Sequence, residues 1–199
     1  MSDTRRPRGE RRRQAILDAT LTLVGREGAG AITHRKVAEE AGVPLAATTY
    51  YFASKEELVR EALLRAVESD QASLDQFAAR LQAAGDIDAL ATALVDLVQD
   101  WLGGHRAVLV SHYEISLEGA RRAELTEISR AWTDGYVLVL APPLARLGSP
   151  SPEKDAWLVH ALLEGMVFDQ LSGARPGFER EWLRPSVERL LRGLLPAEV

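Results

Sequence analysis

Apolar residues recur along this chain at the three- and four-residue spacing of an α-helix, and this periodicity is the strongest constraint on its fold. The first such run is Ile16, Leu17, Thr20, Leu23 and Val24. No segment alternates apolar and polar residues in the way that a half-buried strand does. The periodicity therefore predicts an all-α protein of about nine helices.

Helix start and stop signals divide this pattern into segments. Thr33 is a candidate N-cap for a short helix to Glu40, and Pro44 can begin the next helix because its missing N–H is not needed there. Ser54 to Glu57 has the spacing of a capping box, which predicts the start of a long helix towards Ala84. Further helices are expected over about residues 87–101, 106–118, 122–140, 153–172 and 178–195. Pro142-Pro143 is expected to kink or end the 122–140 helix.

Charge is divided unevenly along the chain, whose net charge is −5. Residues 1–60 carry 11 Lys or Arg against eight Asp or Glu, a balance of +3, and residues 61–199 carry 13 against 21, a balance of −8. Six of the N-terminal arginines lie between Arg5 and Arg13. Such asymmetry indicates an arm that binds nucleic acid or a membrane, or else a solvated basic tail without a partner.

Several classes of protein are excluded by what the sequence lacks. The 199 residues include no cysteine, which excludes disulfides, a thiolate zinc site and a cysteine nucleophile.

No apolar run reaches the roughly 18 residues of a membrane span, and no apolar stretch follows the basic start as in a secretion signal, so we expect a cytoplasmic protein. No nucleotide-binding or hydrolase motif is present, so we expect no enzymatic activity and no cofactor. His105 and His112 have no clear third ligand, so we expect no metal site.

Two short predicted helices, joined by a glycine-containing turn, occupy residues 33–51. This arrangement is typical of a helix-turn-helix, in which the second helix enters the major groove of DNA. A generic helical hairpin has the same spacing, so spacing alone leaves both interpretations open.

The residues of this segment closely resemble the DNA-binding domain of TetR-family transcriptional regulators. The matching motifs are Thr33-His34-Arg35-Lys36-Val37-Ala38-Glu39-Glu40-Ala41-Gly42-Val43-Pro44, then Thr49-Tyr50-Tyr51-Phe52 and Ser54-Lys55-Glu56-Glu57-Leu58. The resemblance covers about Arg11–Leu64. It implies a basic flexible arm at 1–10, a helix-turn-helix DNA-binding domain at 11–58 with its motif at about 33–52, and a helical ligand-binding and dimerisation domain at 59–199.

The resemblance also implies which residues contact DNA. They are Thr33, His34, Arg35, Lys36, Pro44, Leu45, Ala46, Ala47, Thr48, Thr49, Tyr50, Tyr51 and Lys55. Arg35 is the best candidate to contact a base edge, where it would donate two hydrogen bonds to guanine. The alternative is that it binds a phosphate. Many family members have a tyrosine where this chain has Thr49, and a polar residue or glycine where it has Leu45 or Ala46. The recognition helix of this chain is therefore short of hydrogen-bonding side chains. Base reading would then depend on Arg35, Thr48 or Thr49, with contacts to thymine methyl groups and the shape of the DNA.

The C-terminal helices of the family dimerise and enclose an inducer pocket. Pocket candidates are large or polar residues on otherwise apolar helices: Trp101, His105, His112, Tyr113, Trp132, Tyr136, Met166, Phe168 and Asp169. Candidates for a dimer interface are the apolar residues of the last two helices: Trp157, Ala161, Leu162, Leu171, Val187, Leu190, Leu191 and Leu194. The alternative for both sets is ordinary packing in the core of one chain.

The resemblance therefore implies a ligand-responsive homodimeric regulator, a repressor that a small lipophilic molecule releases from a palindromic double-stranded DNA operator. The alternative is a helical small-molecule-binding or interaction module without specific DNA binding. Activation in place of repression is a further alternative.

Overall fold

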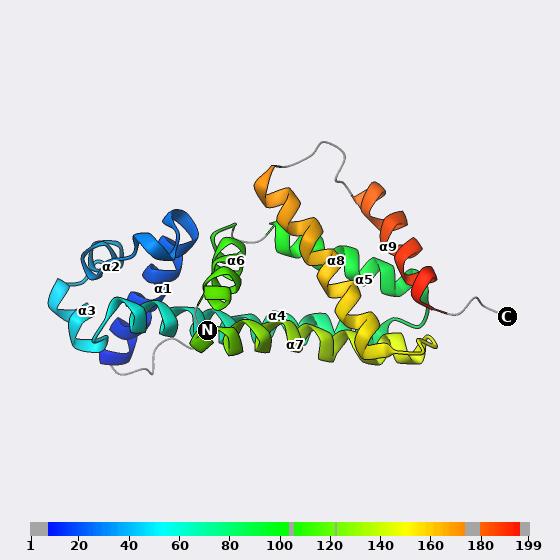
Figure 1. Ribbon diagram of the computed structural model, residues 1–199, viewed down its shortest axis with the longest axis horizontal. Helices are drawn as coiled ribbons and strands as arrows, with labels where there is room; N and C mark the ends of the chain where they lie inside the picture. The colour runs from blue at the N-terminus through cyan, green and yellow to red at the C-terminus, as the bar shows by residue number, and fades with distance from the viewer. Residues whose placement is uncertain (1–7, 104–105, 122, 174–179, 196–199) are drawn as a thin grey trace. The chain divides into compact units, whose positions relative to one another are not determined.

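The computed structural model describes residues 8–103, 106–121, 123–173 and 180–195. Within these residues every regular element is a helix, so the predicted all-α fold is confirmed (Figure 1). The elements are α1 (Arg8–Glu27), the short 3₁₀ turn η1 (Ala29–Ala31), α2 (His34–Ala41), α3 (Leu45–Tyr51), α4 (Lys55–Ala83), α5 (Ile87–Gly103), α6 (Arg106–Arg121), α7 (Ala123–Arg146), α8 (Pro152–Ser172) and α9 (Arg180–Leu194).

The chain divides into two compact units. The first comprises residues 1–69 and 106–129, and the second comprises residues 70–105 and 130–199. The predicted DNA-binding domain ended at residue 58, whereas the first unit continues along α4 and includes α6. The difference arises because α6 packs on α1 and because α4 has no break near residue 58.

The core of the first unit is built around α1. Its apolar stripe, which includes Ile16 and Leu23, is buried against α2, α3 and α6. Thr20 is also fully buried, and its hydroxyl donates to the carbonyl of Ile16 at 2.8 Å, which satisfies the polar group within the helix. The helix begins at Arg8, so the last three residues of the predicted flexible arm are helical, and residues 1–7 lie outside the described part of the chain.

The predicted helix caps are present in the first unit. Thr33 is the N-cap of α2, and its hydroxyl accepts a hydrogen bond from the Lys36 N–H at 3.2 Å. Ser54 accepts from the Glu57 N–H at 3.1 Å. The Glu57 carboxylate accepts from the Ala53 N–H at 2.7 Å, one residue before the position expected for a capping box. These caps fix where α2 and α4 begin, on either side of α3.

The second unit is organised around α5, on which α8 and α9 pack (Figure 1). In α7, Pro142-Pro143 does not end the helix, which continues to Arg146 and so exceeds its predicted end near residue 140. The two prolines remove two backbone donors. Leu140 and Leu144 are nevertheless both 1% exposed, so packing on either side of the prolines holds the helix together.

Candidate nucleic-acid interface

The turn between α2 and α3 is set by Gly42, which ends α2 in the left-handed conformation with φ of +64°. Its N–H donates to the carbonyl of Glu39 at 3.3 Å, and the Val43 N–H donates to the carbonyl of Ala38 at 3.0 Å. Pro44 follows in an extended conformation as the N-cap of α3, one position before its predicted place in the first helical turn. These bonds determine the angle at which the candidate recognition helix leaves α2.

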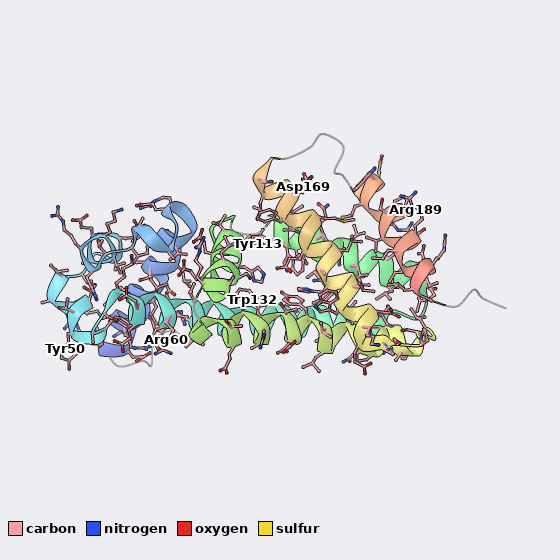
Figure 2. All side chains as sticks on the ribbon, viewed as in Figure 1. Tyr50, Arg60, Tyr113, Trp132, Asp169 and Arg189 are labelled. Carbon is pink, nitrogen blue, oxygen red and sulfur yellow. The ribbon has the colours of Figure 1, made fainter. Side chains whose placement is uncertain are left out.

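Helix α3 presents one buried and one exposed face. Thr48 is fully buried, and its hydroxyl donates to the carbonyl of Leu45 at 2.8 Å and reaches that of His34 at 3.5 Å. The prediction that Thr48 contacts DNA is therefore wrong, because its side chain holds α3 against α2. Leu45 is 49% exposed and Tyr50 is 81% exposed, and Figure 2 shows the Tyr50 side chain pointing away from the helices. Ala46 and Thr49 share the exposed face.

The aromatic residues that end α3 have different environments. Phe52 is 1% exposed and belongs to the core. Tyr51 is half-buried, and its hydroxyl donates to the carbonyl of Gly9 at 3.1 Å, which ties the end of α3 to the first turn of α1. The Tyr50 ring meets Tyr51 edge to face with centroids 5.1 Å apart. Among these rings Tyr50 is therefore the one most accessible to DNA.

The two candidate lysines both bind other parts of the chain. The Lys36 ammonium donates to the Glu27 carboxylate at 2.7 Å, and Arg26 joins Glu27 to Glu40 at 3.1 Å each. The hydrogen bond from Lys36, followed by the one from Arg26, holds the pKa of Glu27 below its usual range. Because that pKa is lowered, the pair is present at neutral pH and is lost only as the pH falls through the lowered value. Lys55 donates to the Gly30 carbonyl at 2.7 Å.

Arg35 makes a different contact, on the same helix. Its Nε donates to the Glu39 carboxylate at 3.1 Å, one helical turn further along α2, and its side chain is 82% exposed. Thr33 is exposed as well, and His34 is half-buried. The first turn of α2 and the exposed face of α3 therefore carry the accessible candidates for DNA contact.

The candidate pocket residues do not form one group. Trp101 and Tyr136 meet edge to face in the second unit with centroids 5.3 Å apart. His112 and Tyr113 form a similar pair at 5.3 Å, but they belong to the first unit. Figure 2 labels Tyr113 on α6 and Trp132 on α7.

The remaining pocket candidates are scattered. Trp132 is buried, Met166 and Asp169 are half-buried, and Phe168 is 53% exposed. His105 lies outside the described residues.

His160 was not among the predicted pocket residues, although it is 3% exposed and lies close to two of the predicted aromatic residues. Its ring centroid is 5.2 Å from that of Tyr136 and 6.4 Å from that of Trp101. Phe77 adds a further ring at 6.4 Å from Tyr136. Helical spacing is the sequence signal that indicates its burial, because His160 lies one turn from the apolar residues Ala156 and Leu163, which are buried. We refer to Phe77, Trp101, Tyr136 and His160 as the aromatic cluster.

The candidate dimer residues divide between the core and the surface. Val187 and Leu191 are fully buried where α9 packs on α5, so placing them at a dimer interface is wrong. Leu171, Leu190 and Leu194 are half-buried. An apolar face of α8 is exposed and consists of Trp157, Leu158, Ala161, Leu162, Gly165 and Phe168. On α9, Trp182 is 52% exposed.

Two other kinds of feature are absent among the described residues. None of their helices is both long and apolar enough to cross a membrane. No three of their acidic or histidine side chains are grouped so that they could hold a metal ion.

Two protein-family models match this chain. The model of bacterial regulatory proteins of the tetR family matches residues 16–62, and the model of a tetracyclin repressor-like C-terminal domain matches residues 85–197. The chain belongs to the TetR family.

Two curated relatives, both named as HTH-type regulators, match part of the chain. The nicotine-responsive transcriptional repressor HdnoR of Paenarthrobacter nicotinovorans is 26% identical over 125 residues, which are 63% of each chain. The transcriptional regulator BetI of Agrobacterium fabrum is 40% identical over 62 residues, 30% of each chain. The chain therefore matches less than two thirds of the length of either relative.

Solved structures are similar over nearly the whole length. A transcriptional regulator of Streptomyces coelicolor A3(2) is 30% identical with a TM-score of 0.72, covering 92% of this chain and 99% of its own. The multidrug binding protein EbrR, complexed with ethidium, is 33% identical with a TM-score of 0.67, covering 93% of this chain and 99% of its own. EbrR has also been solved with proflavin and with malachite green.

The pairing of Lys36 with Glu27 leads to a prediction about non-specific DNA binding. Glu27→Gln removes the carboxylate that holds the ammonium and makes Lys36 available to a phosphate. We expect tighter binding to a random-sequence duplex. The logarithm of the binding constant should also fall more steeply with the logarithm of the salt concentration, by about one released counterion. The measurement is fluorescence anisotropy as a function of salt concentration. Glu56→Gln is the matched control, because it removes the same charge from an exposed position at the start of α4. Equal salt slopes for the two variants would contradict the role assigned to Lys36.

Proposed function

We propose that this protein is a homodimeric, ligand-responsive transcriptional repressor that binds a palindromic operator through α2 and α3. The observation that carries the proposal is the exposed face of α3, with Tyr50 81% exposed beside the exposed first turn of α2. Matches to two TetR-family models and to a relative named as a repressor support it. The +3 balance of residues 1–60 supports a DNA-facing surface on a chain that is acidic elsewhere.

Homodimerisation is supported by the exposed apolar face of α8. Trp157 is 55% exposed, Leu162 is 41% exposed and Phe168 is 53% exposed. Together with the exposed Leu158, Ala161 and Gly165 they follow the three- and four-residue spacing of one helix face. Apolar side chains gathered on one helix face indicate a surface that another chain covers. A second copy related by a two-fold axis would bury this face and would place two recognition helices on successive major-groove turns.

We propose that the inducer is a lipophilic aromatic cation bound at the aromatic cluster of the second unit. The π faces of Trp101 and Tyr136 would attract a positive charge, and residues 61–199 have a balance of −8. The structural neighbour EbrR has been solved with ethidium, proflavin and malachite green, and this likeness supports the same chemical class here. Tyr136 and His160 are each 3% exposed, so binding would require the helices to separate. Such a movement is how a ligand could favour a state with different operator affinity.

Operator binding is tested with the DNA that flanks the protein's own gene. We expect a gel-shift complex that survives excess random-sequence competitor and gives a defined protected segment. Arg35→Ala should reduce discrimination for the operator by about 1–3 kcal/mol, because a bidentate base contact is lost. Weak binding that is equal for all sequences would contradict the repressor and would favour a module without specific DNA binding.

Ligand binding is tested without DNA, by titrating malachite green into the protein in a calorimeter. Trp101→Leu should weaken binding about tenfold, because it removes a π face while keeping an apolar side chain. Trp182→Leu is the matched control, because it makes the same change at an exposed position of α9 that is assigned to neither the aromatic cluster nor the α8 face. The aromatic cluster is not the binding site if both variants bind as the wild type does while circular dichroism confirms their helix content.

A further inference from the structure

The ion pair between Arg35 and Glu39 is the starting point. The Nε of Arg35 donates to Oε1 of Glu39 at 3.1 Å across one turn of α2. The two side chains are 82% and 66% exposed, so neither is engaged in the core. Within the part of the chain that the structure describes, the terminal NH₂ groups of Arg35 make no hydrogen bond. The guanidinium is therefore held on one side and available on the other.

This pair lies on α2, the helix that packs against α3. The buried hydroxyl of Thr48 reaches the carbonyl of His34 at 3.5 Å, so the first turn of α2 lies against the middle of α3. Arg35 is the next residue along α2. The adjacent charges Lys36 and Glu40 belong to a different group, because they pair with Glu27 and Arg26 of α1.

We propose that Glu39 is a positioning residue that orients Arg35 to read a guanine in the operator. This inference rests on the DNA-binding function proposed above. The bond at Nε fixes the plane of the guanidinium and leaves its two terminal NH₂ groups to donate end-on. Two parallel donors at that edge match the O6 and N7 acceptors of guanine in the major groove. Glu39 contacts no base in this role and acts through Arg35.

The physical benefit is that Arg35 is ordered before DNA arrives. A free arginine side chain loses rotamer entropy when it is fixed. A bond formed in the free protein removes part of that loss from the binding step. Docking against DNA also excludes water, which lowers the effective dielectric constant and strengthens the attraction between the guanidinium and the carboxylate.

A competing effect of Glu39 gives the positioning role a distinctive signature. A carboxylate near the DNA repels phosphates and weakens binding to every sequence alike. Removing Glu39 should therefore raise affinity for random DNA and, at the same time, lower discrimination for the correct base. A carboxylate with only a repulsive role would change all affinities by the same factor.

The experiment compares four proteins with the wild type: Glu39→Ala, Arg35→Ala, the double variant, and Glu40→Ala as the matched control. Glu40→Ala removes the same charge from the adjacent position of α2, where the carboxylate pairs with Arg26. Position 39 is exposed on a helix, so alanine there does not threaten folding. Binding sites are first selected from a random library by the wild type, and affinities are then measured for the selected operator and for each single-base replacement.

We expect the wild type to prefer guanine over the other bases by about tenfold or more at one position in each half-site. Arg35→Ala should abolish this preference. Glu39→Ala should lower discrimination at that base about threefold or more, and Glu40→Ala should leave it unchanged. In the Arg35→Ala background, Glu39→Ala should have no further effect on discrimination, because Glu39 acts only through Arg35.

The possible failures are distinguishable. If the wild type selects no sequence, the proposed DNA-binding function fails and the positioning role of Glu39 fails with it. If the wild type selects an operator but Glu39→Ala changes every affinity by one factor, only the positioning role is contradicted. That role alone is also contradicted if Arg35→Ala lowers discrimination at no guanine of the operator. The same holds if Glu39→Ala still lowers discrimination in the Arg35→Ala background.

Discussion

The left-handed turn at Gly42 is the constraint on which the DNA-facing surface depends. A residue with a Cβ would be strained at a φ of +64°, by roughly 1–2 kcal/mol. The bonds from Gly42 and Val43 back to α2 end that helix, and Pro44 begins α3 directly. Thr48 then holds α3 against the first turn of α2. The first turn of α2, which carries Arg35, thereby lies against α3 without any need for a long loop.

Carboxylates of the chain itself balance the cations of this surface. Glu27 and Glu40 hold Lys36 and Arg26 between α1 and α2, and Glu39 holds Arg35 at the exposed edge. Exposed pairs of this kind contribute little to stability, about 0–1 kcal/mol each. Their importance lies in which cations are available to DNA. Lys36 and Lys55 bind carboxylate and carbonyl oxygens of the first unit, whereas Arg35 keeps a free edge. A net charge of −5 is therefore compatible with a DNA-facing surface.

The sequence predicted helices and their caps well because those signals are local. Thr33 and Ser54 act within three residues of their positions, and the apolar stripe of α1 follows a fixed period. Predictions failed where burial is decided by distant partners. The sequence predicts Thr48 as a polar residue that contacts DNA. In the structure its side chain is buried between α3 and α2, where its hydroxyl reaches the carbonyl of His34.

The same reasoning explains the errors in the C-terminal half. Val187 and Leu191 lie on an apolar stripe of α9 that could face either α5 or another chain, and the structure places them on α5. In α7, packing of Leu140 and Leu144 outweighs the helix-breaking tendency of Pro142-Pro143. The contribution of α6 to the first unit had no local signal, because it depends on contact with α1 across a long sequence separation.

The central claim is that two copies of this chain present two recognition helices to one operator. Hydroxyl-radical footprinting of the wild-type protein on its selected operator tests this most directly. We predict two equivalent protected patches on one face of the duplex, about 34–36 Å apart and related by a two-fold axis. A single protected patch, or two patches at another spacing without symmetry, would contradict the claim.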